Sequence, residues 1–170
     1  MAIDEHLSQF ALGVESWNEW VRLRRVQQQT TNRYTGTRHE GAKIGVSNFW
    51  AELSGADLSG WDLNQGKPGS YSTGIDLIGV DLRDADLSGT NLAWAELTGA
   101  TLSGADCRGT TLASARLHGA NLSGADLIGT NIAGTDLLMV NLRGANLTRA
   151  HLYETVFSDT DLTDIVEQRS

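Results

Sequence analysis

The sequence predicts an all-β solenoid in which short strands alternate with sharp corners. From residue 75 to residue 164 the chain repeats every five residues, as a small residue, Asp or Asn, Leu, a variable residue and often Gly. Neither an α-helix nor a flat strand keeps one side chain inside at a period of five. In an extended segment the small residue and the Leu point to one side, and the Asp or Asn points away. Gly in the fifth slot suits the third residue of a type II turn, where φ is positive.

The large residue at the centre of each unit defines the predicted core. Between residues 77 and 162 it recurs (162 − 77)/5 + 1 = 18 times. Four corners close a square, so about twenty residues make one coil, and coils stack about 4.8 Å apart through strand-type hydrogen bonds. One coil cannot bury its apolar side chains alone, so stacking is obligatory. The predicted core residues are Leu77, Leu82, Leu87, Leu92, Leu97, Leu102, Cys107, Leu112, Leu117, Leu122, Leu127, Ile132, Leu137, Leu142, Leu147, Leu152, Phe157 and Leu162.

These repeats resemble the pentapeptide-repeat family. The motif GADL occurs at 55–58 and 124–127, RDADLSGTNL at 83–92 and RGANLT at 143–148. The resemblance, which covers about two thirds of the chain, implies a right-handed quadrilateral parallel β-helix. Because most members of the family have no assigned activity, it says little about function.

The composition fits a small protein of one domain. The chain has 170 residues, a net charge of −8 and neither a long apolar run nor an apolar N-terminal segment. We therefore expect a cytoplasmic protein that does not enter a membrane. The single cysteine, Cys107, occupies an inward slot, which predicts a buried core thiol rather than a reactive one.

An amphipathic helix is expected ahead of the repeats, in residues 1–28. Apolar residues recur there at spacings of three and four, as on the buried face of a helix. We expect the helix to cover the open end of the first coil, which would otherwise invite edge pairing. The alternative is a partner-docking helix with a basic tip at Arg22, Arg24 and Arg25. The predicted cap residues are Leu7, Phe10, Val14, Trp17 and Val21.

The remaining segments complete the predicted organisation. Residues 29–48 form a polar connector or an irregular first coil, residues 49–164 the β-helix, and residues 165–170 a tail. The repeat breaks at residues 64–73, a segment with the only proline, which predicts a loop expelled from one corner. The residues singled out in this loop are Lys67, Pro68 and Tyr71.

The charge of the repeats limits which class of partner the protein can bind. Residues 51–164 contain 15 Asp and Glu against 6 Lys and Arg. An acidic rod repels nucleic acid, so we expect no direct DNA or RNA binding. The resemblance also implies an alternative: pentapeptide proteins of quinolone resistance are believed to mimic DNA and to inhibit or protect DNA gyrase. Basic residues interrupt each acidic column here, which weakens a continuous phosphate-like stripe.

One predicted face of the rod is nearly uncharged, and we expect a partner there. In steps of twenty residues it carries Asn91, Thr111, Asn131 and His151, with inward threonines beneath. One interpretation is a Thr/Asn ladder that only strengthens stacking. The other is a flat protein-docking or dimer face with aromatic anchors. The candidate contact residues are Trp94, Ala113, Asn131, Ala133, His151 and Tyr153, with a weaker patch at Leu138 and Met139.

Enzymatic chemistry finds no support in the sequence. The four histidines are scattered, and neither His118 nor His151 has a Ser, Cys or carboxylate one coil away in its column. Outward carboxylates on a convex surface make a poor calcium cage. We therefore expect no catalytic residue, cofactor or metal. The predicted function is a non-catalytic scaffold that binds an unidentified protein; the alternatives are a gyrase-directed DNA mimic and a purely structural spacer, with a homodimer through an end or the neutral face also considered.

Overall fold

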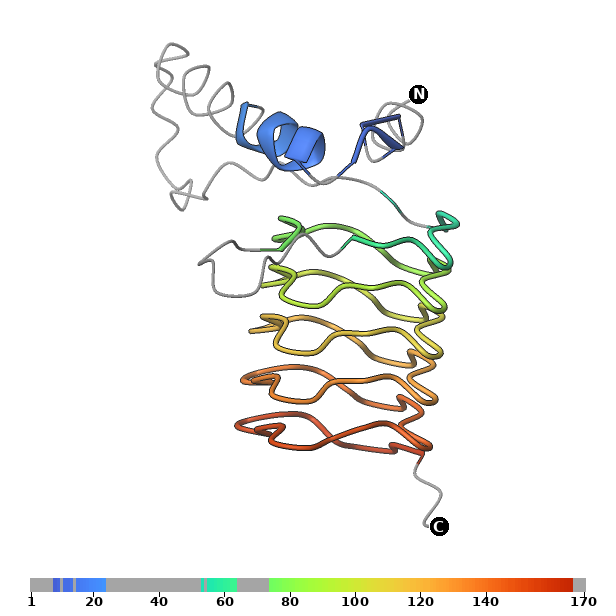
Figure 1. The fold of residues 1–170 in the computed structure, drawn as a ribbon. Helices are drawn as coiled ribbons and strands as arrows, with labels where there is room; N and C mark the ends of the chain where they lie inside the picture. Colours follow the sequence, from blue (N-terminus) through green and yellow to red (C-terminus); the bar gives the residue numbers. More distant parts are fainter. Residues whose placement is uncertain are drawn as a thin grey trace, which may run out of the picture.

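The computed structural model describes residues 8–9, 11–13, 15–23, 53, 55–63 and 74–166. Within these residues the repeats wind into a stack of coils, and helical turns of the N-terminal segment lie at one end of the stack (Figure 1). Some predictions concern residues outside the described ones: Leu7, Phe10, Val14, the connector 29–48, the loop 64–73 and most of the tail.

Four columns of parallel bridges define four faces. Each bridge joins the Asp or Asn slots of adjacent coils, usually 20 residues apart, as between Asp76 and Glu96. The bridges occur singly because the chain turns a corner every five residues, so no strand lengthens. The first face carries Asp76, Glu96, Arg116, Asp136 and Val156; the second Asp81, Thr101, Asn121, Asn141 and Asp161; the third Asp57, Asp86, Asp106, Asp126, Asn146 and Val166; the fourth Asp62, Asn91, Thr111, Asn131 and His151.

The break in the repeat sits at the corner between the fourth and first faces. Across it the bridge from Asp57 to Asp86 spans 29 residues instead of 20, so nine residues are inserted. The N–H of Leu63 still donates to Asn91 O at 2.9 Å, and that of Gly74 donates to Trp94 O at 3.1 Å. A Cβ on Gly74 would lie 2.7 Å from the backbone C and O of Trp94, so this close approach requires glycine.

The core follows the predicted five-residue pattern except at the end of the stack. Central residues from position 77 to position 147 are buried. In the final coil Leu152 is only partly buried, and Phe157 and Leu162 keep 37% and 40% of their surface exposed. The prediction of a buried core was therefore wrong for Phe157 and Leu162, because no further coil within the described residues covers them.

Inward threonines strengthen the contact between coils. The Oγ1 of Thr110 donates to Leu87 O at 2.7 Å, and that of Thr130 donates to Cys107 O at 2.6 Å. Leu87 O also accepts the N–H of Thr90 at 3.0 Å within its own turn. A buried hydroxyl costs free energy unless it is bonded, and these are bonded to the coil before. The same bond recurs at Thr90, Thr135, Thr155 and Thr160.

The N-terminal segment is not one continuous helix. Residues 8–9 and 11 are helical, the chain breaks at Gly13 with φ of 96°, and a helix follows over residues 15–23. A positive φ is what glycine permits at a helix end, so the prediction of one uninterrupted helix was wrong at this residue. No helix in the described part of the chain is long and apolar enough to cross a membrane.

The helix over residues 15–23 packs on the first coil. Trp17 and Val21 are 1% and 2% exposed and belong to the same hydrophobic cluster as the repeats. Trp20 is partly buried against that cluster, with its ring centroid 5.3 Å from that of Trp17. Both tryptophans thus pack toward the stack, so neither is a freely available docking side chain.

Replacing Thr110 with Val tests the inward hydroxyl bonds. The change keeps the shape of the side chain but removes the donor to Leu87 O, and we expect a loss of about 1 kcal/mol in the free energy of unfolding. Urea denaturation followed by circular dichroism measures it. The matched control is Thr111→Val, the adjacent outward residue, with an expected change within about 0.5 kcal/mol. Equal losses in both variants would contradict the assignment.

Candidate interaction surface

Most outward Asp and Asn side chains have a local structural task. The Oδ1 atom of Asn121 accepts the N–H of Ser123 at 3.1 Å, and Oδ1 of Asp136 accepts that of Leu138 at 3.0 Å. This Asx-type bond caps the corner that follows each short strand. The acidic columns therefore arise largely from turn chemistry. The pattern had suggested only that these side chains point outward.

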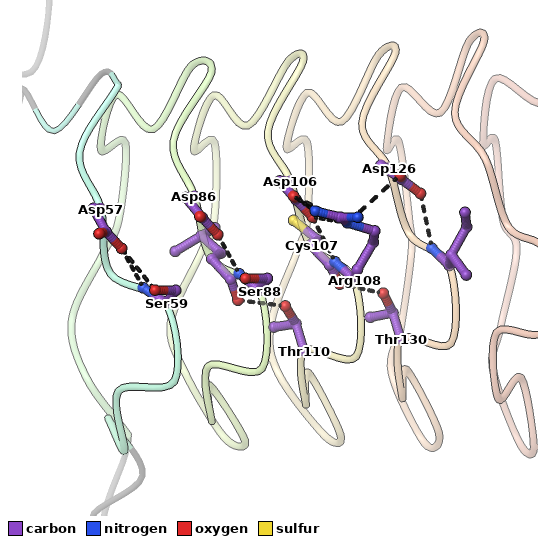
Figure 2. Close-up of polar contacts among 12 residues, drawn as sticks. Asp57, Ser59, Asp86, Ser88, Asp106, Cys107, Arg108, Thr110, Asp126 and Thr130 are labelled. Carbon is purple, nitrogen blue, oxygen red and sulfur yellow. Dashed lines mark hydrogen bonds and ion pairs between the residues drawn. The ribbon is translucent and has the colours of Figure 1, made fainter.

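Arginines neutralise several of these carboxylates. On the third face Arg108 donates to both carboxylate oxygens of Asp106 and lies 3.9 Å from Asp126 in the next coil (Figure 2). On the first face Arg116 Nη1 lies 2.7 Å from Glu96 Oε1, one coil earlier. The hydrogen bond from Arg108 lowers the pKa of Asp106, as the bond from Arg83 lowers that of Asp81.

Below its first residue, the column of the fourth face holds no Asp, Glu, Lys or Arg. Asp62 heads its column and accepts the side-chain N–H of Asn91 at 3.0 Å. Below it the column continues with Thr111 and Asn131, and Oδ1 of Asn131 caps the N–H of Ala133 at 3.1 Å. The face therefore combines a rigid backbone with small side chains. We call this surface the neutral face: Asn91, Ala93, Thr111, Ala113, Asn131, Ala133, His151 and Tyr153, with Trp94 at its corner.

Trp94 is the exceptional residue of the neutral face. It has φ of 64°, in the left-handed region where most other corners have glycine, and 55% of its surface is exposed. Its N–H donates to Ala113 O at 3.0 Å, so the backbone is held in the stack like that of its neighbours. Ser114, Gly134 and the charged Glu154 follow at the same corner in the next coils with the same sign of φ. The corner geometry is thus kept although tryptophan is poorly suited to it.

The other predicted contact residues fall into two separate groups. Asn131, Ala133, His151 and Tyr153 share the neutral face with Trp94, and Tyr153 is 74% exposed. Tyr153 lies three coils from Trp94 along the stack, about 14 Å at the usual coil spacing. Ala113, between them, is partly buried.

Leu138 and Met139 lie beyond the first face, at a different corner. Met139 has φ of 58° and is 59% exposed, and Leu138 O accepts the N–H of Gly119, next to His118 in the preceding coil. The column of the first face, with Glu96 and Arg116, separates this patch from Trp94. The structure does not join the two patches into one surface.

Groups that often carry chemistry are inert or dispersed. Cys107 is buried, and burial raises the pKa of its thiol to about 12, with the nearby charge of Asp106 acting in the same direction. Within the described residues no three His, Cys, Asp or Glu side chains are placed to hold a metal ion.

Comparison with known proteins places the repeats in context. A family model described as pentapeptide repeats matches residues 73–104, 90–129, 105–137 and 125–164, with 8 copies. The crystal structure of the pentapeptide repeat protein Rfr23 from the cyanobacterium Cyanothece 51142 is 31% identical, with a TM-score of 0.58 over 69% of this chain and 91% of that chain. These matches confirm the predicted right-handed quadrilateral β-helix.

Two further solved structures are similar to this chain. A pentapeptide repeat protein, alr5209 from Nostoc Pcc 7120, is 28% identical over 69% of this chain and 81% of that chain, with a TM-score of 0.34. The plasmid-mediated fluoroquinolone resistance protein QnrB1 is 20% identical over 69% and 80%, with a TM-score of 0.35. At these TM-scores neither likeness supports an argument about function. No protein of curated function matches.

Replacing Asn121 with Ala tests the Asx caps. The N–H of Ser123 loses its side-chain acceptor, and we expect the free energy of unfolding to fall by about 1 kcal/mol, as for loss of a helix cap. Denaturant titration measures the change. Asn121→Asp keeps the Oδ1 acceptor and should restore most of the loss; an Asp variant as unstable as the Ala variant would argue against the cap.

Replacing Asp106 with Asn tests the pairing with Arg108 through its pH dependence. A carboxylate whose pKa is lowered by folding stabilises the protein above its unfolded pKa of about 3.9, and this contribution is lost as the pH falls through the lower folded value. Asn keeps the cap but carries no charge. The Tm of the wild type should therefore exceed that of Asp106→Asn at pH 7, and the difference should shrink below about pH 4. A difference that is constant from pH 7 to pH 3 would rule out this pairing as its source.

Proposed function

The chain belongs to the pentapeptide-repeat family, and from that premise we propose that it is a non-catalytic scaffold that binds a protein partner through its neutral face. The observation that supports this most directly is Trp94. Its position favours glycine, and its side chain remains more than half exposed.

The free energy of folding does not explain why tryptophan occupies position 94. A left-handed backbone costs a residue with a Cβ about 1–2 kcal/mol relative to glycine, and an exposed indole recovers little of that through burial. Glycine occupies the same corner at Gly134, so the fold accepts it there. Strained residues with exposed apolar surface are typical of binding sites.

The surroundings of Trp94 suit a protein surface rather than a small ligand. Small side chains at Ala113 and Ala133 leave the face flat, and Tyr153 supplies a second exposed ring. The coil hydrogen bonds hold the backbone beneath both aromatic residues. An aromatic anchor on a rigid support loses little conformational entropy on binding, which is the arrangement found at interface hot spots.

A DNA mimic that acts on gyrase remains the alternative, and it depends on an unbroken line of carboxylates. On the third face Arg108 lies between two carboxylates of the column, and on the first face Arg116 itself occupies the slot below Glu96. The charge pattern therefore favours the protein-binding surface. A supercoiling assay with purified gyrase decides between them, because inhibition at micromolar concentration would support the mimic.

Replacing Trp94 with Gly tests the neutral face. We expect stability equal to that of the wild type or up to about 1 kcal/mol higher, and at least about tenfold weaker partner binding, as for loss of an aromatic hot spot. A partner captured from the native host by immobilised wild-type protein is identified by mass spectrometry, purified and titrated against each variant.

Asp84→Gly is the matched control for this experiment. Asp84 also has a positive φ, of 55°, but lies at a corner between the second and third faces. This variant should keep the partner. Equal binding by the wild type and Trp94→Gly would remove the neutral face as the docking surface.

A further inference from the structure

Arg149 differs from every other arginine in the described part of the chain. Each of the other five contacts a carboxylate, while Arg149 has no such contact with a described residue. The five pairs are Arg22–Glu19, Arg83–Asp81, Arg108–Asp106, Arg116–Glu96 and Arg143–Asp164. On a chain with a net charge of −8, an arginine without a carboxylate partner is a departure that the repeat does not explain.

The backbone position of Arg149 is also unusual. It lies at the corner between the third and fourth faces, with φ of 58°, and its side chain is exposed. Four earlier coils have glycine at this corner: Gly60, Gly89, Gly109 and Gly129. A left-handed backbone costs free energy in a residue with a Cβ, and here neither burial nor an ion pair with a described residue offsets that cost. Among the described non-glycine residues with positive φ, Arg149 is the only cation.

Two exposed side chains follow Arg149 on the neutral face. His151 and Tyr153 come at alternate positions, so both side chains lie on the outer surface of the same coil. Guanidinium, imidazole and phenol groups can all donate hydrogen bonds to a carboxylate. The same slots in the preceding coil hold no charge: Gly129, Asn131 and Ala133. Glu154 lies at the opposite corner of the face, so an anion is favoured only on the side of Arg149.

We propose that Arg149, with His151 and Tyr153, receives a carboxylate of the protein partner, so that the partner contributes an acidic segment. This inference rests on the proposed function, because it names the chemistry of the partner for the same face. Below Asp62 the column of that face holds no Asp, Glu, Lys or Arg, so Arg149 provides a charge for recognition at its edge. A carboxylate suits this position better than a phosphate, because the acidic rod repels a dianion more strongly.

The positions of Arg149 and Trp94 define the length of the segment. They lie at opposite corners of the fourth face and 149 − 94 = 55 residues apart, which is nearly three coils. At the usual strand geometry the separation is roughly 15–20 Å, and five or six extended residues span it. The partner segment therefore carries an apolar residue for Trp94 and a carboxylate five or six residues away.

A synthetic peptide tests this inference without knowledge of the partner. The probe is an octapeptide with leucine at one end, a Gly/Ser linker and two glutamates at the other end, and its control has two glutamines instead. Titrations of the ¹⁵N-labelled full chain, followed by NMR, should shift the signals of Arg149 and His151. We expect the glutamine peptide to bind at least about tenfold more weakly, and Arg149→Gly to lower the affinity for the glutamate peptide by a similar factor.

Matched variants separate a local contact from an effect of net charge. Arg143→Ala removes the same charge from the second face, where Arg143 lies 3.8 Å from Asp164, and it should bind as the wild type does. Arg149→Lys keeps the charge and should retain most of the affinity. Circular dichroism verifies that each variant is folded. The inference is overturned if Arg149→Gly binds like the wild type, if Arg143→Ala weakens binding equally, or if about 5 mM peptide shifts neither signal.

Two further arms identify the anion and separate this inference from the proposed function. Inorganic phosphate that shifts Arg149 at the same concentrations as the peptide would overturn the preference for a carboxylate. Trp94→Gly should weaken the peptide as well. If Trp94→Gly binds normally but Arg149→Gly does not, the aromatic anchor fails and the carboxylate contact stands. The reverse result would keep the anchor and overturn this inference.

Discussion

The backbone bonding between coils, in a register of 20 residues, is the constraint on which the rest of this structure depends. The strands of one coil do not pair with one another, and each of them is so short that it forms a single bridge to the adjacent coil. Apart from a turn bond at each corner, such as that from Thr90 N–H to Leu87 O, the backbone N–H and C=O groups of a coil find their partners in the coils before and after it. Central leucines and inward threonines can be buried only because neighbouring coils lie at strand spacing. Stability in such a stack is a property of contacts between coils rather than of any coil.

This constraint explains why the chain is acidic. The outward slot most often presents an oxygen that caps the following corner, and Asp and Asn both provide one, as Asp136 and Asn121 do. Repeating that slot along the chain produces columns of carboxylates regardless of any partner. Arginines such as Arg108 then offset part of the charge. Net charge in this protein is thus weak evidence about what it binds.

Departures from the repeat are more informative than the repeat itself. Where a corner is occupied by Trp94 or Met139 instead of glycine, the chain accepts backbone strain and exposes apolar surface. Where the stack begins, Trp17 and Asn18 bond to the coil edge; where it ends, Phe157 and Leu162 remain uncovered. A repeat protein interacts through such differences, because identical coils offer every partner the same surface.

The period of five by itself determined the side of the chain on which each residue lies and the buried positions from Leu77 to Leu147, because parity and corner spacing are local properties, while the four-sided cross-section followed more firmly from the resemblance to the pentapeptide-repeat family. Breaks in the period also located the insertion at residues 64–73 and the corner where Trp94 stands in place of glycine. The sequence also predicted the helix that covers the first coil, with Trp17 and Val21 buried, but tertiary structure alone decided the bonds and the exposure at the two ends. Asn18 meets Asp76 across 58 residues, and Phe157 is exposed because no described coil follows it. Repetition specifies each coil from its neighbours, and an end residue lacks one neighbour, so its burial and bonding depend on contacts that no local pattern encodes.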